Sequence, residues 1–479
     1  MMPVLLWTDL LVFLLIACGI GAGVYVSRRE YLLASWRRVG ESRAGMASLT
    51  LLLAFVAVGL LDSLHYRPRL EAANGQPAGG YGSEVRSALD ALLLPLKTRT
   101  EKTYSAPLAT HLYAKETVEL ADGSQARVFP RLKHGGAHLE DAEAEWSRDV
   151  VLRILRGLAL AVLAGPTFAA LAVLAAARRW GMNWQAAWRH IRRGETRFAW
   201  NAVLLTLAAL LLLVGPAISL AGGYHVFGTD KVGQDVLYLT LKSIRTGLVI
   251  GTITTLAMLP FAVALGIAAG YLGGWVDDLI QYLYTTLNSI PGVLLIAASV
   301  LMVQVLIDTH PAWFATAAQR ADARLLALCL ILGVTSWTGL CRLLRAETLK
   351  LRELEYVQAA QAFGASAARI MGRHVLPNVM HIVLIAVVMD FSGLVLAEAV
   401  LSYIGIGVDP STISFGTMIN TARLELAREP VVWWSLLAAF VFMFVLVLAA
   451  NLFSDTVRDA FDPRVAGRRG VSSAQEPAA

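Results

Sequence analysis

Long apolar runs separated by shorter polar segments make up most of the chain. A helix needs about 20 apolar residues to cross the hydrocarbon core of a bilayer. We predict nine spans, at 7–26, 46–61, 149–177, 199–222, 238–270, through Pro291 to 307, 323–341, from 379 through Glu398, and 431–453. The pattern therefore predicts an all-α polytopic membrane protein.

A long polar stretch, residues 62–147, contains no run that could cross a membrane. Ser83–Leu96 has a helical pattern. Thr117–Phe129 alternates around Asp122 and Gly123, a pair that favours a hairpin turn. We predict a small α+β insertion outside the membrane, either a structural cap on the spans or a docking surface for a partner.

A second polar segment, residues 342–378, lies between the seventh and eighth predicted spans. Apolar residues recur at helical spacing from its start to about Gly364. Gly364 then breaks the run, and Ala365–Met371 begins a second short helix. We expect Pro377 to end that helix, because proline lacks the amide donor and disfavours helical geometry in the residue before it. The two helices would lie on the membrane surface or meet another protein.

Arginines gather in the loops after the first and third predicted spans, and short loops rich in Lys and Arg stay on the cytoplasmic side. These arginines are Arg28, Arg29, Arg37, Arg38, Arg43, Arg178, Arg179, Arg189, Arg192, Arg193 and Arg197. The N-terminus is therefore predicted to lie outside. Arg464, Arg468 and Arg469 keep the C-terminal tail inside, and its last ten residues are predicted to be disordered.

Three tryptophans of the second basic loop, Trp180, Trp184 and Trp188, recur every four residues. This spacing places them on one face of a helix. Tryptophan beside arginine is typical of a helix that lies among lipid head groups. We therefore expect a helix in contact with membrane lipid here.

Composition supports the membrane assignment, since 57% of the residues are hydrophobic and 16% are charged, against about a quarter charged in soluble domains. The net charge of +6 lies in short loops beside spans, which argues against nucleic-acid binding. Cys18, Cys329 and Cys341 show no pair spacing, so neither a disulfide framework nor a metal site is predicted. No cleavable signal peptide is recognisable, and the first apolar run reads as a retained span.

Two glycine patterns predict local geometry. Gly228 and Gly233 favour tight turns, and Asp230 is expected to cap the helix that follows. Gly266 and Gly270 form a small-xxx-small pattern, which allows two helices to approach closely.

The polar loop carries a further pattern at Gln358, Ala359, Ala360, Gly364, Ile370, His374, Leu376, Pro377 and Asn378. These positions resemble the signature loop of binding-protein-dependent ABC importer permeases. The resemblance implies that the loop forms coupling helices in a groove of a cytoplasmic ATPase subunit. The first motif position is often glutamate in that family, so Gln358 lacks a charge that a salt bridge would need.

Four other stretches resemble the dipeptide/oligopeptide/nickel (C-type) subfamily, and they imply a type I ABC importer transmembrane domain. They are 225–236, 271–278, 390–407 and 455–464. The implied organisation is two transmembrane helices at 1–61, an extracytoplasmic insertion at 62–148, two further transmembrane helices at 149–222, a permease core at 223–464 and a disordered cytoplasmic tail at 465–479.

Missing motifs narrow the chemistry. The sequence has no GxxxxGK[ST] phosphate-binding loop, so ATP is expected to bind to partner subunits and not to this chain. It also has no HExxH, CxxC or GxSxG motif, and its histidines form no close cluster, so no enzyme activity, cofactor or metal is predicted. The resemblance implies a bacterial inner-membrane permease with three kinds of partner, namely a second homologous permease, ABC ATPases and a periplasmic binding protein.

Two acids, Asp390 and Glu398, lie within the eighth predicted span. Intramembrane acids are costly and often functional, so we expect them to shape the translocation path or to face the partner permease. Satisfaction by neighbouring groups is the alternative. The substrate is expected to be peptide-like, with nickel or another small solute also open. The other readings are a secondary transporter driven by an ion gradient through these acids, and a scaffold or sensor built on residues 62–147.

Overall fold

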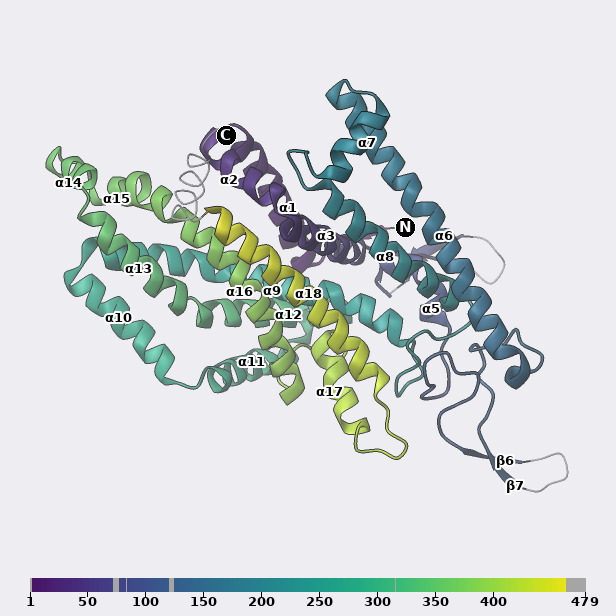
Figure 1. Ribbon diagram of the computed structural model, residues 1–479. Coiled ribbons are helices and arrows are strands. Elements are labelled where there is room, and N and C mark those ends of the chain that lie inside the picture. Colours follow the sequence, from purple (N-terminus) through teal and green to yellow (C-terminus); the bar gives the residue numbers. More distant parts are fainter. Residues whose placement is uncertain (1, 72–76, 83, 120–124, 315, 462–479) are drawn as a thin grey trace. The chain divides into compact units, whose positions relative to one another are not determined.

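The computed structural model describes residues 2–71, 77–82, 84–119, 125–314 and 316–461 (Figure 1). Within these ranges nine helical runs are long and apolar enough to cross a membrane. They are α1 (Trp7–Ser27), α3 (Arg43–Ser63), α6 (Ala142–Trp180), α8 (Trp200–Ala221), α9 (Val236–Leu272), α11 (Gly292–Thr309), α12 (Ala317–Ser336) with α13 (Thr338–Arg352), α15 (Ala367–Ile370) with η2 (Met371–Val375) and α16 (Leu376–Ile404), and α18 (Trp434–Phe461). The predicted all-α polytopic class is confirmed.

Shorter helices lie between these runs. They are α2 (Glu30–Glu41), α4 (Ala88–Leu92), α5 (Leu94–Thr98), α7 (Trp184–Arg193), α10 (Gly274–Ser289), the 3-10 turn η1 (Pro311–Trp313), α14 (Glu355–Ala362) and α17 (Phe415–Glu425). The helix expected over Ser83–Leu96 begins only at Ala88, because Ser87 and Asp90 form a capping box there. It also breaks at Leu93, between α4 and α5.

The strands form small antiparallel sheets. The described strands are β1 (Met2–Val4), β2 (His65–Arg67), β3 (Arg69–Glu71), β4 (Pro77–Tyr81), β5 (Arg86–Ser87), β6 (Glu116–Glu119) and β7 (Gln125–Val128). The order β1-β2-β5 gives one sheet, while β3 pairs with β4 and β6 with β7. Glu116 faces Val128 across the β6–β7 hairpin, as the alternation predicted; its expected turn at Asp122 and Gly123 lies outside the described residues.

The chain divides into two compact units, each built from segments distant in sequence. One contains Met1–Val4, Tyr25–Thr246 and Ile413–Thr456, and the other contains Leu5–Val24, Gly247–Thr412 and Val457–Ala479. We call them unit 1 and unit 2. The five-part division predicted along the sequence stays a prediction, and the tail at 465–479 lies outside the described residues.

In unit 2, α9 and α13 pack in close contact. A Cβ placed on Gly266 would lie 2.8 Å from the carbonyl oxygen of Cys341, and one on Gly270 would lie 2.6 Å from the Cβ of Thr348. Real Cβ atoms rarely approach other atoms so closely, so glycine is required at both positions. The close approach predicted for this pair is confirmed.

In unit 1, α6 and α8 cross at a similar contact between small residues (Figure 1). A Cβ on Gly157 would lie 2.5 Å from the Cα of Pro216. At its other end α6 stops at Trp180, because Gly181 adopts left-handed geometry with φ 65°. The single helix face predicted for three tryptophans is therefore wrong, since only Trp184 and Trp188 belong to α7.

A buried histidine joins the polar insertion to the segment before α9, also in unit 1. His225 Nδ1 lies 2.7 Å from the Asp235 carboxylate, and Nε2 lies 3.4 Å from Glu101. Glu101 also accepts hydrogen bonds from the backbone amides of residues 133–135, the shortest at 2.7 Å. All three side chains are at most 3% exposed. These contacts attach two parts of the insertion to one point.

The contacts within this cluster raise the pKa of His225 and lower that of Glu101. Burial alone would lower the pKa of His225, but hydrogen bonds to Asp235 and Glu101 outweigh it and raise the pKa to about 9. For Glu101, burial favours the neutral acid. Hydrogen bonds from His225 and the backbone amides prevail and lower its pKa to about 2. The cluster is thus an ion pair at neutral pH.

The turn before α9 is close to the predicted form. Gly228 and Gly233 have φ of 70° and 76°, which confirms both glycine turns. The expected cap is wrong, however, because Asp230 accepts amides inside the turn. Asp235 caps α9 instead, through amide bonds of 2.9 and 3.2 Å, because it directly precedes the first helical residue.

Candidate functional site

The polar loop between α13 and α16 lies in unit 2 and begins at a bidentate ion pair. Arg345 Nε and Nη2 on α13 donate to the two carboxylate oxygens of Asp277 on α10, each at 2.6 Å. The hydrogen bonds from Arg345 hold the pKa of Asp277 below its usual value. Paired parallel bonds of this kind fix orientation as well as distance, so α10 and α13 are joined near the base of the loop.

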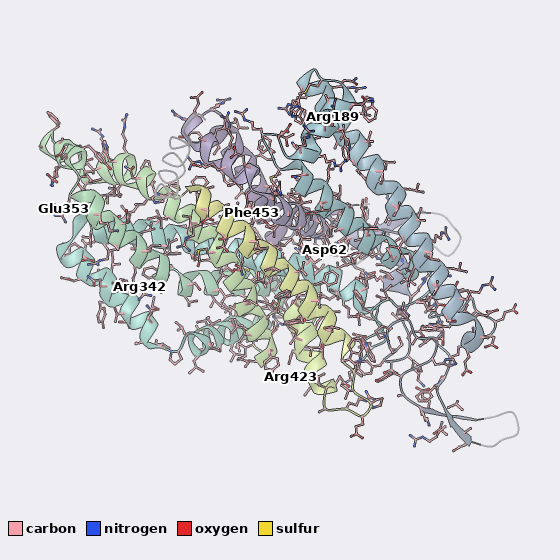
Figure 2. The ribbon with its side chains drawn as sticks, in the orientation of Figure 1. Asp62, Arg189, Arg342, Glu353, Arg423 and Phe453 are labelled. Atoms are coloured by element: carbon pink, nitrogen blue, oxygen red, sulfur yellow. The ribbon has the colours of Figure 1, made fainter. Side chains whose placement is uncertain are left out.

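The first helical segment of the loop is shorter than predicted. The single helix expected from residue 342 to Gly364 is interrupted at Glu353 and Leu354, which separate α13 from α14. Leu354 is extended, with ψ 139°. Figure 2 labels Arg342 on α13 and Glu353 at its end, from which α14 projects. The extended residue redirects the chain so that the buried Val357 faces the core of unit 2.

Gly364 ends α14 in left-handed geometry, with φ 78°. Its amide donates to the carbonyl of Gln361, and the amide of Ala365 donates to Ala360. This pair of bonds is a Schellman motif, which needs a residue free to adopt positive φ. No atom lies within 4 Å of a Cβ placed on Gly364, so backbone geometry and not space demands glycine here.

The loop has a buried inner side. Val357, Ile370, Val375 and Val379 are each at most 1% exposed and belong to the same hydrophobic cluster as Leu344. At about 25 cal/mol per Å² of apolar surface, such side chains each contribute about 1.5–3 kcal/mol. The short helices are therefore fixed to the bundle as a rigid unit.

The outer side of α14 is exposed and partly apolar. Phe363 is 91% exposed and Tyr356 is 43% exposed. Gln358 and Ala359 are also exposed, and the Gln358 side chain donates to the Glu353 carbonyl at 3.3 Å. An exposed aromatic side chain on a rigid helix is typical of a protein contact. Phe363 is not among the positions predicted from the sequence, although its place directly before Gly364 offered a signal.

A polar contact connects the two arms of the loop. The Asn378 side chain donates to the hydroxyl of Tyr356 at 2.9 Å and to the carbonyl of His374 at 2.6 Å. The rings of Tyr356 and His374 lie 6.2 Å apart. This arrangement brings the start of α14 next to the start of α16.

The helix end predicted at Pro377 is wrong. Ala367–Ile404 runs on as one helical span, with the π-helical turn η2 before Leu376. Pro377 lies in the first turn of α16, directly after the π-helical turn η2, where the regular ladder of helical hydrogen bonds is already interrupted. Of the other predicted positions, Ile370 is fully buried, Ala360 and Leu376 pack against the cluster, and His374 is half-buried. The predicted set is thus divided between an anchoring side and an outer side.

The structure places the two acids of α16 in different surroundings. Glu398 is 2% exposed and accepts a hydrogen bond from Ser402 at 2.6 Å. Asp390 is half-buried, and within the described residues no side chain or backbone group bonds to it. Eight positions apart on one helix, they lie about 12 Å from each other. They do not form one site.

Among the described residues, no group of three or more His, Cys, Asp or Glu side chains could hold a metal ion. The candidate site therefore consists of the surface of α14, the turn at Gly364 and the arm that leads into α16. Such a surface can contact a partner.

Comparison with known proteins bears on this loop directly. Residues 262–467 match the model of the binding-protein-dependent transport system inner membrane component. The oligopeptide transport system permease protein OppC of Mycobacterium tuberculosis is 32% identical over 296 residues, which cover 57% of this chain and 95% of that protein. The chain belongs to this family of ABC importer permeases.

Other relatives agree. The dipeptide transport system permease protein DppC of Bacillus subtilis is 28% identical over 295 residues, covering 59% of this chain and 86% of that protein. A solved MetNI methionine ABC transporter in an inward-facing conformation is 15% identical, with a TM-score of 0.36 over 47% of this chain and 98% of that one, a likeness too low to bear on the fold.

Membership of the permease family has direct consequences. The chain is a multi-pass inner-membrane protein, in agreement with its nine candidate spans among the described residues. Permease components of ABC transporters are not enzymes, so the predicted lack of enzyme activity holds. The matched segment begins inside α9 and includes the whole loop.

Proposed function

We propose that this permease receives the movement of a cytoplasmic ABC ATPase through the outer side of α14. The observation that carries the proposal is the 91% exposed Phe363 beside the left-handed Gly364, on helices anchored by buried Val357 and Ile370. A rigid projecting helix with an exposed aromatic side chain suits insertion into a groove. ATP is bound by the ATPase, and this chain needs no cofactor.

The geometry supports a lever mechanism. A push on α14 passes through the turn at Gly364 and the contact of Asn378 with Tyr356. From there it reaches α16, which continues into the membrane without interruption. The Arg345–Asp277 pair carries the same movement to α10. Closing and opening of the ATPase would thus rock the spans of unit 2.

The remaining partners follow from the family. We propose that a second homologous permease completes the pathway and that a periplasmic binding protein delivers a peptide-like substrate, as the names of the OppC and DppC relatives suggest. We also propose that Asp390 lines the pathway or faces the second permease, because it is half-buried and has no bonding partner among the described residues. In this arrangement the N-terminus lies outside and the C-terminus in the cytoplasm.

Purification of the tagged chain in mild detergent tests the proposal. Recovery of a second permease and an ATPase is expected, together with loss of the ATPase when residues 353–373 are replaced by a flexible linker. The matched control replaces the exposed turn between α17 and α18, residues 426–431. It uses a flexible linker of the same composition as the one that replaces the loop. If the chain is recovered alone from both wild-type and control cells, the importer proposal fails and transport driven by an ion gradient replaces it.

A further inference from the structure

The three helices α6, α7 and α8 of unit 1 line an open, groove-shaped cavity that the importer function does not use. Its volume is about 990 Å³, at the upper end of ligand-binding pockets. The walls are almost entirely apolar and include Ala169 of α6, Trp184 and Trp188 of α7, and Ala208 of α8. We call this cavity the α6–α8 groove.

Helix packing explains why the groove exists. At one end α6 and α8 touch at Gly157 and Pro216. At the other end α7 is held by a buried cluster that includes Val173, Ala187 and Ile191. Between these two contacts the facing walls carry small side chains, such as Ala169 and Ala208, which leave the space open.

One end of the groove is polar and positively charged, and the rest is apolar. Arg192 and Asn201 are its polar lining residues. Within the described part of the chain, no carboxylate forms an ion pair with Arg192. The Arg43 guanidinium lies 3.6 Å from a Cβ placed on Gly194, in the turn that follows Arg192. Figure 2 labels Arg189 on the same short helix, α7.

We propose that the α6–α8 groove binds one anionic phospholipid, with its acyl chains along Ala169 and Ala208 and its phosphate beside Arg192. The α6 wall from Ala161 to Leu174 is about 20 Å long, enough for the hydrocarbon of one leaflet, which is about 15 Å deep. Tryptophan at the boundary and arginine at the head group match a lipid that is polar at one end only.

Because only one end of the groove is polar, it suits a lipid better than a transmembrane helix of another protein. A transmembrane helix of another subunit would need an apolar partner surface along its whole length. Such a helix would offer no polar group to the exposed Arg192 at the other end of the groove. A phosphate satisfies the guanidinium, and flexible acyl chains fill an irregular space. This binding site is independent of the proposed contact with an ATPase.

Native mass spectrometry of the full chain, purified in mild detergent, tests the site. We expect about one phosphatidylglycerol or cardiolipin molecule to stay bound per chain. The double variant Ala169→Leu and Ala208→Leu fills the groove from both walls and should remove most of this lipid. The matched control, Ala175→Leu with Ala209→Leu, makes the same change at exposed positions of α6 and α8 that do not line the groove, and it should retain the lipid.

A charge variant tests head-group recognition separately. In nanodiscs of phosphatidylcholine, with or without phosphatidylglycerol, Arg192→Gln should lower the preference for the anionic lipid about fivefold, the effect of one arginine near a head group. Arg179→Gln, also exposed but outside the groove, should leave the preference unchanged. Equal lipid content in the filled and control variants would overturn the proposal. Cross-linking of the Trp184→Cys variant to another membrane subunit would also overturn it, because it would show a helix in the groove.

Discussion

At the scale of the residue, Gly364 determines the angle between the two arms of the polar loop between α13 and α16. Its φ of 78° is open to glycine but strained for residues that carry a Cβ. Because nothing lies within 4 Å of the position of that Cβ, a substitution there changes backbone energy without a steric clash. Its effect on function can therefore be read as an effect of backbone geometry.

Substitution of Gly364 should uncouple ATP hydrolysis from transport. Gly364→Pro forces φ to about −65°, which is incompatible with the observed turn, and should abolish uptake while the complex still hydrolyses ATP. Gly364→Ala costs about 1–2 kcal/mol and should reduce uptake partially. Uptake and ATPase rates in proteoliposomes measure both effects. Gly372→Ala, also with open space around it but without positive φ, is the control. Substrate-stimulated uptake retained in Gly364→Pro would contradict the lever mechanism.

Phe363 should be a main contact with the ATPase. Since it is 91% exposed, Phe363→Ala removes little packing from the chain itself. Truncation of a central aromatic contact typically costs about 2 kcal/mol or more, so affinity for the ATPase should fall about 30-fold or more. Titration of the ATPase against permease in nanodiscs measures this. Leu424→Ala on α17, at a residue 71% exposed, should have no effect, and equal affinities of the two variants would exclude Phe363 from the interface.

At the scale of the element, the loop is a rigid body held at several points. Its inner side is buried through Val357 and Ile370, its arms meet through Asn378, and its base is tied to α10 through Arg345 and Asp277. Only the last of these ties is ionic and can be removed without opening a large cavity. It therefore allows a test of how α10 and α13 depend on each other.

Asp277→Asn should lower the apparent unfolding temperature and reduce uptake. The single change leaves Arg345 without its charged partner, while Arg345→Gln leaves the carboxylate alone. Because both side chains are partly shielded, at 25% and 14% exposed, a double-mutant cycle should show coupling of about 1–3 kcal/mol. Thermal unfolding of the two single variants and the double variant in detergent measures it. Additive effects would mean that the pair does not join the two helices.

At the scale of the whole molecule, the chain extends well beyond the part that its relatives share. The family match covers residues 262–467, whereas α6, α7, α8 and the insertion precede it. Within unit 1 the insertion is attached through Glu101 and His225. Its attachment therefore depends on a titratable pair.

Stability of this attachment should depend on pH. The raised pKa of His225, about 9, means that its contribution is complete below the unfolded value near 6.5 and is lost as pH rises toward 9. The lowered pKa of Glu101, about 2, gives a contribution that is complete above about 4.5 and is lost as pH falls toward 2. The difference in unfolding temperature between wild type and His225→Gln should therefore be largest near pH 4.5–6.5 and shrink toward pH 9. A difference that does not vary with pH would refute the ionic contact.

The sequence by itself determined those features that depend on neighbours along the chain. The nine spans, the turns at Gly228 and Gly233 and the break at Gly364 follow from apolar length and from the conformational freedom of glycine. The family could also be recognised from the loop, because its motif lies within one short stretch, residues 358–378. The predicted contact of the loop with an ATPase remains a prediction.

Only the tertiary structure decided which residues of these elements face inward. It buried Ile370 and exposed Phe363, and it carried the helix through Pro377. It also joined Glu101 to His225, more than a hundred residues away, and opened the groove between α6, α7 and α8. Such contacts arise where helices cross, and the crossing is set by packing between distant segments, which a local pattern of apolar and polar residues does not specify.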